Sequence, residues 1–305
     1  MDSMSSVFPR VAVLLAAYNG MEWIEEQLDS ILNQINVSVA VFISVDPSTD
    51  GTESFCSAYA GQHSNITLLP GIGRFGGASR NFFRLIRDVD FSSFDYVAFS
   101  DQDDLWHSDK LHRATSVLAL VIFEGYSSNV IAFWPDGRKM LLDKAQPQVR
   151  WDYLFEAAGP GCTYVISRPL ADAFKASLIE NWELCQRVSL HDWYCYAYAR
   201  HHGFRWFIDS TSSMHYRQHA ANQVGANTGI SAFTGRLKKI TGGWWPEQVL
   251  LINRLIGDTP PLALNGKSDF LRLIFMAGHC RRRRRDKLLF IIACLAAAAS
   301  KKEPA

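Results

Sequence analysis

Three aspartates lie close together immediately after a short apolar segment. Asp101, Asp103 and Asp104 follow residues 96–100, and a single glutamine separates the first two. Carboxylates at this spacing repel one another, and folding tolerates them most easily when a cation neutralises their charge. Oxygen ligands suit Mg²⁺ or Mn²⁺, which in enzymes also bind substrate phosphates. The cluster therefore predicts a divalent-cation site, with a solvated acidic turn or a helix cap as the alternative.

Asp46 occupies a similar place after an earlier apolar segment. It is followed by Pro47, Ser48, Thr49 and Asp50. A carboxylate at the end of a strand can accept a hydrogen bond from a nucleobase N–H group or a ribose hydroxyl. The same residue types fit an Asx turn followed by a helix cap, and for Ser48 and Asp50 that interpretation is favoured.

Two later segments also carry residue types that suit acid–base or phosphate chemistry. Asp192 follows His191 ahead of an expected helix, where a carboxylate serves either as a general base or as a helix cap. Residues 215–219 include Arg217 and His219, which are types that hold a diphosphate or a metal ion. Isolated residues of these types more often lie at the surface, so this segment predicts a ligand site only together with the others.

The elements that must position these residues alternate between strands and helices. Apolar runs predict buried strands at Val11–Ala17, Val39–Val45, Ile66–Leu69 and Tyr96–Ser100. Helical spacing of apolar residues predicts helices over Met21–Gln34, from about Asp50–Thr52 and over Ala78–Asp88. This alternation predicts an α/β fold with a doubly wound, mostly parallel sheet. Because the polar turns follow strand carboxyl ends, we expect them to converge on one crevice.

The chain between residues 105 and 229 is less regular. Its clearest elements are a strand at Thr163–Ser167, a helix at Asp192–His202 and a strand at Phe204–Ile208. The glycine-rich stretch 71–77 matches neither the GxxxxGK[ST] phosphate loop nor the GxGxxG turn. These mismatches argue against a P-loop kinase and against a nicotinamide-dependent enzyme.

Composition and charge exclude other classes. The 305 residues are 48% hydrophobic and 20% charged, as in a folded globular protein, and no apolar run reaches the ~20 residues of a membrane span. The net charge of +1 is the sum of −8 in residues 1–229 and +9 in residues 230–305, which indicates a basic tail that meets an anionic surface. The six cysteines lack CxxC spacing and no secretory signal is recognisable, so we expect free thiols in a cytoplasmic protein.

Taken in order, seven segments resemble the family 2 glycosyltransferases of the GT-A fold. The resemblance is greatest to the rhamnosyltransferase-like group that builds bacterial surface polysaccharides. The segments are LLAAYNG (14–20), DPSTDGT (46–52), GASRNF (77–82), FSDQDDLW (99–106), GCT (161–163), HDW (191–193) and YRQH (216–219). Each motif is modest alone, but their order and spacing are specific, and together they cover about residues 10–225.

The resemblance implies a nucleotide-sugar donor, a divalent cation (Mn²⁺ or Mg²⁺) and roles for individual residues. The donor would be bound by Ala17, Tyr18, Asn19, Asp46, Arg80, Asn81, Asp101 and Arg217. The cation would be held by Asp101 and Asp103, which form the DxD motif of the family, and by a histidine, either His219 or His215. Asp192 would be the catalytic base. The acceptor would lie beside Gly161, Cys162 and Trp193.

The resemblance also implies the reaction. The family transfers its sugar in one displacement with inversion of configuration, and dTDP-rhamnose is the expected donor, with a glycan or a lipid-linked acceptor. The sequence departs from the family pattern at Val45, which replaces the first of two adjacent acidic residues, and at Pro47, which replaces a glycine. Recognition of the nucleobase would then shift to Asp46.

The basic residues 230–305 divide the chain, so we expect an 8–229 GT-A domain followed by a helical extension. Residues 233–240 interleave apolar and basic side chains, and Trp244 and Trp245 follow them. Such sequences are typical of helices that lie at a membrane surface, where tryptophan favours the headgroup region.

The rest of the extension strengthens that expectation. Helical apolar segments at Val249–Ile256 and Leu288–Ala299 flank five consecutive arginines, Arg281–Arg285. Basic residues near a membrane attract anionic lipid. We therefore expect peripheral binding to the inner face of the cell membrane, with a soluble tail and a solvated arginine run as the alternative. Nucleic-acid binding is not expected, because aromatic stacking motifs are lacking.

Two other functions fit part of the sequence. A metal-dependent nucleotidyltransferase also joins an α/β sheet to metal-binding aspartates, but residues 17–20 offer no basic side chain to grip a phosphate at the first turn. A non-catalytic assembly partner of the same fold would explain Val45 and Pro47. The complete set of Asp101, Asp103 and Asp192 argues against that interpretation.

Overall fold

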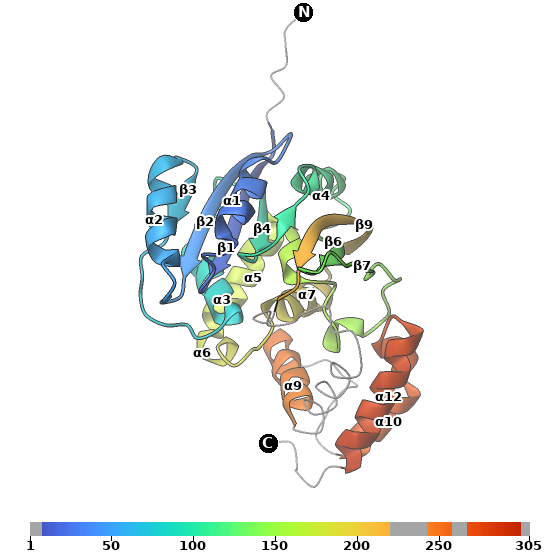
Figure 1. Ribbon diagram of the computed structural model, residues 1–305. Coiled ribbons are helices and arrows are strands. Elements are labelled where there is room, and N and C mark those ends of the chain that lie inside the picture. The colour runs from blue at the N-terminus through green and yellow to red at the C-terminus, as the bar shows by residue number, and fades with distance from the viewer. Residues whose placement is uncertain (1–7, 220–242, 258–266, 300–305) are drawn as a thin grey trace, which may run out of the picture.

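A nine-stranded sheet forms the centre of the protein in its computed structural model, which describes residues 8–219, 243–257 and 267–299 (Figure 1). The strand order is β3-β2-β1-β4-β8-β6-β9-β5, and β7 pairs with β6 beside this path. Helices lie on both faces of the sheet. The predicted α/β, doubly wound architecture is therefore confirmed.

The first half of the sheet is parallel, and its elements closely match the predicted ones. The strands are β1 (Arg10–Ala17), β2 (Ser38–Val45), β3 (Ile66–Leu68) and β4 (Tyr96–Ser100). The helices between them are α1 (Ile24–Leu32), α2 (Thr52–Gln62) and α3 (Ala78–Asp88). Helix α1 starts later than the predicted Met21, because the backbone N–H groups of Trp23 and Ile24 both donate to the Gly20 carbonyl in a turn.

Strand β1 shows why this half folds as it does. Its side chains alternate between two apolar cores: Val13 and Leu15 pack with α1, α2 and α4, and Leu14 packs with α3 and α5. All three are fully buried. A strand covered on both faces must be apolar at every position, which is the pattern of its sequence. The polar residues that follow β1 are thereby held at the edge of the sheet.

The second half of the sheet mixes strand directions. Its elements are β5 (Leu105–Trp106), α4 (Lys110–Leu118), β6 (Gly125–Phe133), β7 (Lys139–Leu142), β8 (Val165–Ser167), α5 (Arg168–Glu180), α6 (Trp182–Cys185), α7 (His191–His201) and β9 (Trp206–Arg217). Strand β8 lies antiparallel between β4 and β6, whereas the long ladder between β6 and β9 is parallel. Short 3₁₀ turns occupy Asp152–Leu154 and Gly161–Thr163.

Strand β9 is much longer than the predicted strand Phe204–Ile208. The polar residues 209–213 have the composition of a loop, yet they continue the ladder with β6 across two irregular steps. Asp209 explains part of this, because it accepts hydrogen bonds from Tyr126 (2.8 Å) and Arg113 (2.7 Å). The strand therefore runs on to Arg217 and carries that residue to the acidic turn.

The C-terminal helices complete one of the two cores. They are α9 (Trp244–Ile256), α10 (Lys267–Phe275), α11 (Ala277–Cys280) and α12 (Arg284–Ala299), and α10 packs beside α12 (Figure 1). Trp245 packs against Phe155 and Phe290, with ring centroids 6.0 and 5.7 Å away. The predicted helices at 249–256 and 288–299 are thus present as parts of α9 and α12. The segment 233–240 lies outside the described residues.

Two expectations about the chain as a whole can also be compared with the structure. All six cysteines are buried free thiols, as expected. Among the helices of the described residues, none has the length and apolar character needed to cross a membrane.

Candidate active site

A large cavity of about 1420 Å³ opens where the polar turns meet. The turns after β1, β2 and β4 all line it, so the predicted convergence is confirmed. The glycine-rich loop before α3 and the start of α7 contribute further walls. The residues preceding and beginning α12 complete it, although they are distant in sequence. A cavity of this size exceeds that of most small-ligand pockets.

His219 and Asp103 contact each other where both line the cavity. The His219 Nε2 atom lies 2.7 Å from a carboxylate oxygen of Asp103, and both residues line the cavity. Trp23 stacks on the His219 ring, with centroids 4.1 Å apart. A carboxylate and an imidazole at this distance are suitable ligand types for a divalent cation. The structure thus brings together two of the three predicted metal ligands across more than a hundred residues.

Arg217 contacts the acidic turn that carries Asp103. Its guanidinium donates to the Asp103 carbonyl (2.9 Å) and pairs with Glu26 (2.5 Å). Its backbone N–H donates to Asp104 at 3.1 Å. Arg217 does not line the cavity. In this structure it holds the acidic turn in place and does not point toward the space where a donor would bind.

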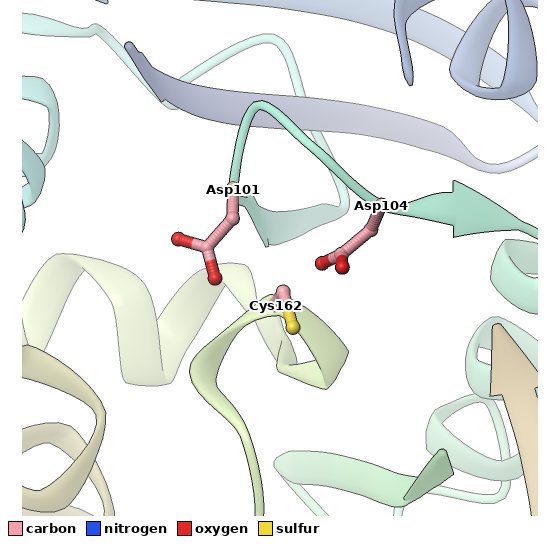
Figure 2. A group of neighbouring side chains, drawn as sticks. All are labelled: Asp101, Asp104 and Cys162. Atoms are coloured by element: carbon pink, nitrogen blue, oxygen red, sulfur yellow. The ribbon is translucent and has the colours of Figure 1, made fainter. Parts of the chain in front are cut away.

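Asp101 lies at the edge of the cavity above a buried polar cluster. Figure 2 shows the carboxylates of Asp101 and Asp104 gathered with the thiol of Cys162, and their ligand-type atoms lie within 4.8 Å of one another. Burial, together with the charge of Asp103, raises the pKa of Asp101 to about 7. Burial also raises the pKa of the Cys162 thiol well above its usual value.

A buried lysine partly compensates this cluster. Lys110 is fully buried, and its Nζ donates to the Cys162 carbonyl at 2.5 Å. The same ammonium lies 3.2 Å from the ring centroid of Trp106. Burial lowers the pKa of Lys110 to about 7, while the charges of Asp104 and Asp101 oppose that shift. Of the three residues in the cluster, only Asp101 lines the cavity, and Asp104 and Cys162 are packed beneath it.

The turn after β1 is fixed by the acidic turn itself. Gln102 accepts a hydrogen bond from the Tyr18 backbone N–H (2.7 Å) and donates to the Tyr18 carbonyl (2.9 Å). A Cβ at Gly20 would lie 2.2 Å from the Gln102 amide oxygen, which explains the glycine. Asn19 adopts a left-handed conformation (φ 46°), and its side chain accepts the Thr49 N–H at 2.9 Å. Ala17, Tyr18 and Asn19 all line the cavity, as expected of donor-side residues.

Asp46 organises the glycine-rich loop. Its two carboxylate oxygens accept the backbone N–H groups of Phe75 (2.7 Å) and Gly76 (2.9 Å). The residue is buried but still lines the cavity, and Arg74 of the same loop lines it as well. Asp46 thus has a structural task in addition to any contact with a ligand. Arg74 had no motif to mark it in the sequence.

Asn81 and Arg80 differ in where they point, although they are neighbours on α3. Asn81 lines the cavity and donates to the carbonyls of Ser44 (2.9 Å) and Ala17 (3.4 Å). Its amide oxygen is buried without a hydrogen-bond partner. Arg80 does not line the cavity and donates instead to the Gln186 carbonyl at 2.8 Å.

Asp192 lies in the first turn of α7 and lines the cavity. Its carboxylate accepts the backbone N–H of Trp193 at 2.8 Å and is also hydrogen bonded by the backbone of Gly161. Burial raises the pKa of Asp192 to about 6, and its charge in turn helps to raise that of Asp101. The two carboxylates therefore share one cavity, and Asp192 can change its protonation state near neutral pH.

Gly161 allows Asp192 to sit where it does. A Cβ at this position would lie 2.8 Å from His191 Nε2 and 2.9 Å from the Asp192 Cβ. His191 is buried and stacks on Phe82 with ring centroids 3.9 Å apart, and burial lowers its pKa to about 3. A neutral imidazole and a close glycine thus form the floor of the cavity beside the carboxylate.

The two other residues expected on the acceptor side do not line the cavity. Trp193 is buried in the core, and its indole N–H donates to the Tyr153 carbonyl at 2.9 Å. Cys162 belongs to the buried cluster below Asp101. Both lie directly beside cavity residues in sequence, and helical or 3₁₀ geometry turns their side chains inward.

Basic side chains form one wall of the cavity, although no sequence motif linked them to the site. Lys144 lines the cavity, and its charge lowers the pKa of Asp192, so the two groups are close. Arg281–Arg285, expected as a membrane-facing run, line the same cavity. Arg282 is buried between Asp152 and Glu156 at 3.6 and 3.5 Å. Part of the arginine run is therefore an internal structural element, and not a fully solvated surface.

The fold and the cavity define the class of protein. The structure is similar to the crystal structure of S. aureus TarS residues 1–349 in complex with UDP, with a TM-score of 0.54 and 16% identity over 94% of this chain and 70% of the other. It is also similar to the mannosyltransferase PcManGT from Pyrobaculum calidifontis in complex with GDP-Man and Mn²⁺, with a TM-score of 0.55 and 19% identity over 98% and 77% of the chains. The fold is that of a GT-A glycosyltransferase.

Sequence comparison identifies the family. A family model described as Glycosyltransferase like family 2 matches residues 9–127. The dTDP-rhamnosyl transferase RfbG of Shigella flexneri is 47% identical over 245 residues, which cover 80% of this chain and 85% of that protein. The chain belongs to glycosyltransferase family 2, and the protein is a glycosyltransferase that uses a nucleotide-sugar donor. The expected family is confirmed.

Proposed function

We propose that the protein transfers rhamnose from dTDP-rhamnose, with inversion, to a glycan or lipid-linked acceptor during surface polysaccharide synthesis. The name and the 47% identity of RfbG support the donor. The observation that carries the mechanism is that the Asp192 carboxylate lies in the same cavity as the DxD turn and the donor-side turns. The proposed base for the acceptor and the proposed ligands of the donor thus face the same cavity.

The donor nucleotide is bound by the turns after β1 and β2 in this proposal. Ala17, Tyr18 and Asn19 form one wall, and Asp46 and Asn81 form the next. The unpartnered amide oxygen of Asn81 supports a ligand contact, because a buried acceptor without a hydrogen bond is costly. Asp46 recognises the base or ribose while its backbone contacts keep the glycine-rich loop closed.

The donor diphosphate is held next to Asp101, Asp103 and His219. The fit to a divalent cation rests on the donor set, because an imidazole and a carboxylate meet at 2.7 Å beside the half-buried Asp101. Burial raises the pKa of Asp101, and the negative charges of Asp103 and Asp192 raise it further. When bound by these residues, Mn²⁺ or Mg²⁺ would supply positive charge that stabilises the leaving diphosphate. Asp104 and Cys162 are poorer candidates because they are packed below the cavity and the thiol stays protonated.

Asp192 acts as the general base. As the acceptor oxygen bonds to the anomeric carbon, the bond from that carbon to the donor diphosphate breaks. The hydroxyl proton passes to the Asp192 carboxylate. A pKa of about 6 leaves this carboxylate ionised at neutral pH but basic enough to take a proton. Gly161 lets the backbone approach Asp192 closely, because a Cβ there would meet the Asp192 Cβ at 2.9 Å.

The remaining expected site residues act as positioning residues in this proposal. Arg217 fixes the DxD turn through Asp103 and Asp104. Arg80 ties α3 to the segment before α7 through the Gln186 carbonyl. Trp193 anchors the start of α7 in the core through its indole N–H.

Membrane association is proposed for the exposed face of the α10–α12 pair. Five large apolar side chains are between 39% and 91% exposed there: Leu271, Phe275, Leu288, Ile292 and Leu295. The exposed Arg283–Arg285 adjoin this face at the start of α12. Exposed apolar residues next to arginines are typical of proteins that adsorb to anionic bilayers. The protein would then work at the cytoplasmic face of the membrane.

The donor proposal is tested by thermal stabilisation with a panel of nucleotide sugars, with and without Mn²⁺ or Mg²⁺. We expect dTDP-rhamnose and dTDP to raise the melting temperature in the presence of the cation, and UDP and GDP sugars to do so less. Equal stabilisation by a UDP or GDP sugar would contradict the dTDP assignment. The Asp103→Asn variant should lose the cation-dependent part of the effect.

The membrane proposal is tested by flotation with phosphatidylglycerol vesicles. Removal of residues 230–305 is unsuitable, because α9 and α12 contribute to the core. We instead propose Phe275→Glu, which changes a side chain that is 91% exposed, with Leu120→Glu on the loop after α4 as the matched control (64% exposed). Flotation should fall only for Phe275→Glu, and equal flotation of both variants would refute the proposed face.

A further inference from the structure

The arginine wall of the cavity carries positive charge that the described residues neutralise only in part. Arg281 and Arg282 are engaged internally: Arg281 donates to the Phe155 carbonyl (2.6 Å), and Arg282 lies between Asp152 and Glu156. These two side chains fix the segment to the domain. They leave the next three arginines at the cavity.

The next three arginines are exposed and line the cavity. Arg283 is 3.5 Å from Asp143, in an ion pair whose two side chains are each 42% exposed. Within the described part of the chain, Arg284 and Arg285 have no ion-pair partner. Asp286 lines the same wall but is not within ion-pair distance of either. Two guanidinium groups therefore face the cavity without a counter-charge.

Lys144 links this wall to the reacting centre. Its pKa is lowered by burial and further by the charges of Arg282 and Arg281, so it stands next to the arginine segment. Its charge also lowers the pKa of Asp192. Lys144 therefore lies between the arginine segment and the proposed base on the wall of one cavity.

An apolar strip continues from the arginines to the exterior. Leu289, Phe290 and Ile292 of α12 line the cavity directly after the arginine run. Ile292 is also 39% exposed, and Leu288 and Leu295, one turn away on either side of it, are 61% and 50% exposed. Residues at this spacing share one face of a helix. The strip thus leads from the cavity to the open face of the α10–α12 pair.

We infer that this wall is an acceptor subsite in which Arg284 and Arg285 bind the diphosphate of a lipid-linked acceptor and the strip on α12 contacts its hydrocarbon chain. The inference rests on the proposed function, and it narrows the acceptor to an anionic amphiphile. Guanidinium groups bind phosphate oxygens in a bidentate manner, and an adjoining apolar surface matches a lipid chain. The large cavity leaves space for sugar units between the diphosphate and Asp192.

The inference is tested by calorimetric titration of the full-length protein with farnesyl diphosphate, a soluble lipid diphosphate. The donor site is first saturated with dTDP and Mn²⁺, so that it cannot take up the probe. The test variant is Arg284→Gln/Arg285→Gln, whose changed side chains are exposed and have no ion-pair partner among residues 8–219, 243–257 and 267–299. The control is Arg272→Gln on α10, which removes an exposed charge (80% exposed) outside the cavity.

We expect the double variant to weaken farnesyl diphosphate binding by about tenfold or more, as for the loss of charge-assisted hydrogen bonds. Arg272→Gln should bind as the native protein does. Pyrophosphate and farnesol should each bind more weakly than farnesyl diphosphate, because each supplies only half of the interaction. Equal binding by the double variant and the native protein, or equal binding of farnesol and farnesyl diphosphate, would overturn the inference.

Two further measurements separate this inference from its alternatives. If the double variant loses binding to phosphatidylglycerol vesicles but not to farnesyl diphosphate, the arginines serve the membrane surface and the acceptor subsite is refuted. Binding of dTDP is measured in all variants. Normal dTDP binding with unchanged farnesyl diphosphate binding overturns the subsite alone, whereas absence of dTDP binding in the native protein overturns the donor assignment on which it rests.

Discussion

Replacing Asp192 by asparagine removes the proposed proton acceptor and leaves the local structure nearly unchanged. An asparagine Oδ1 can still accept the Trp193 N–H, which lies 2.8 Å from the present carboxylate. A positioned general base contributes about 10²–10⁴-fold to a rate. We therefore expect kcat to fall by that factor, while the Kd for dTDP stays within about twofold.

The pH dependence of transfer gives a second readout of the same change. The pKa of Asp192 is raised to about 6 by burial, and the base must be ionised to accept a proton. The native kcat should therefore decline about tenfold per pH unit below about pH 6 and level off above it. In Asp192→Asn this inflection should be lost. The assay is initial-rate release of dTDP between pH 5 and 8.

The free energy of unfolding should change with pH in the opposite direction to kcat. The folded pKa of about 6 lies above the ordinary aspartate pKa of about 3.9, so the folded protein disfavours the ionised form. The native protein should lose stability as the pH rises from about 4 to 6, and above pH 6 it should carry the full cost, at most about 3 kcal/mol. Asparagine cannot ionise, so the variant should melt higher than the native protein at pH 8, and this advantage should disappear near pH 4.

Asp172→Asn serves as the matched control, because Asp172 is an exposed aspartate on α5. It should change neither rate nor pH profile. A kcat of Asp192→Asn within tenfold of the native value would refute the assignment of the base. A retained inflection near pH 6 in that variant would show that another group titrates, even if the rate falls.

Three further changes test the structural reasoning. Gly161→Ala should lower kcat at least tenfold and destabilise the protein by about 1–3 kcal/mol through overpacking. Gly159→Ala should have a smaller effect in activity and melting assays, because its Cβ would lie 3.5 Å from the nearest atom, the Ser128 carbonyl oxygen. Asp103→Asn should abolish the Mn²⁺ dependence of dTDP binding measured by calorimetry, and unchanged dependence would contradict its role as a ligand. Arg282→Leu should cost about 3 kcal/mol in urea unfolding, because it removes the buried guanidinium between Asp152 and Glu156, which among the described residues then keep only Arg200 and Arg281 as ion-pair partners. Arg284→Leu should stay within about 0.5 kcal/mol, and similar losses in both would refute the division of the arginine run.

The strands and helices of the first hundred residues could be predicted because their signals are local. Continuous apolar runs such as Val11–Ala17 are typical of strands that are buried on both sides, and the turns after them carry residues that break regular structure. Strand β9 shows the opposite case. Its polar segment 209–213 reads as a loop, and only pairing with β6 and the bonds to Asp209 make it a strand.

The candidate site was predictable in its residue types but less so in its side-chain directions. Asp101, Asp103 and Asp192 do line one cavity. Arg80 and Arg217 belong to matching motifs, yet neither lines the cavity, and their guanidinium groups bond to the backbone carbonyls of Gln186 and Asp103. A motif specifies which residues are near a site, but the packing of each element decides whether a side chain enters it.

The C-terminal segment shows most clearly what the sequence and the tertiary structure each determine. The sequence alone established its helices, its charge of +9 and the five consecutive arginines, because composition and periodicity are properties of a short stretch of chain. It did not establish which arginines are solvated. Asp152 and Glu156 lie more than a hundred residues earlier, and only the folded chain brings them to Arg282. Arg284 and Arg285 line the cavity and have no ion-pair partner among the described residues. The five arginines therefore differ, because ion pairing depends on distance in space and not on distance along the chain.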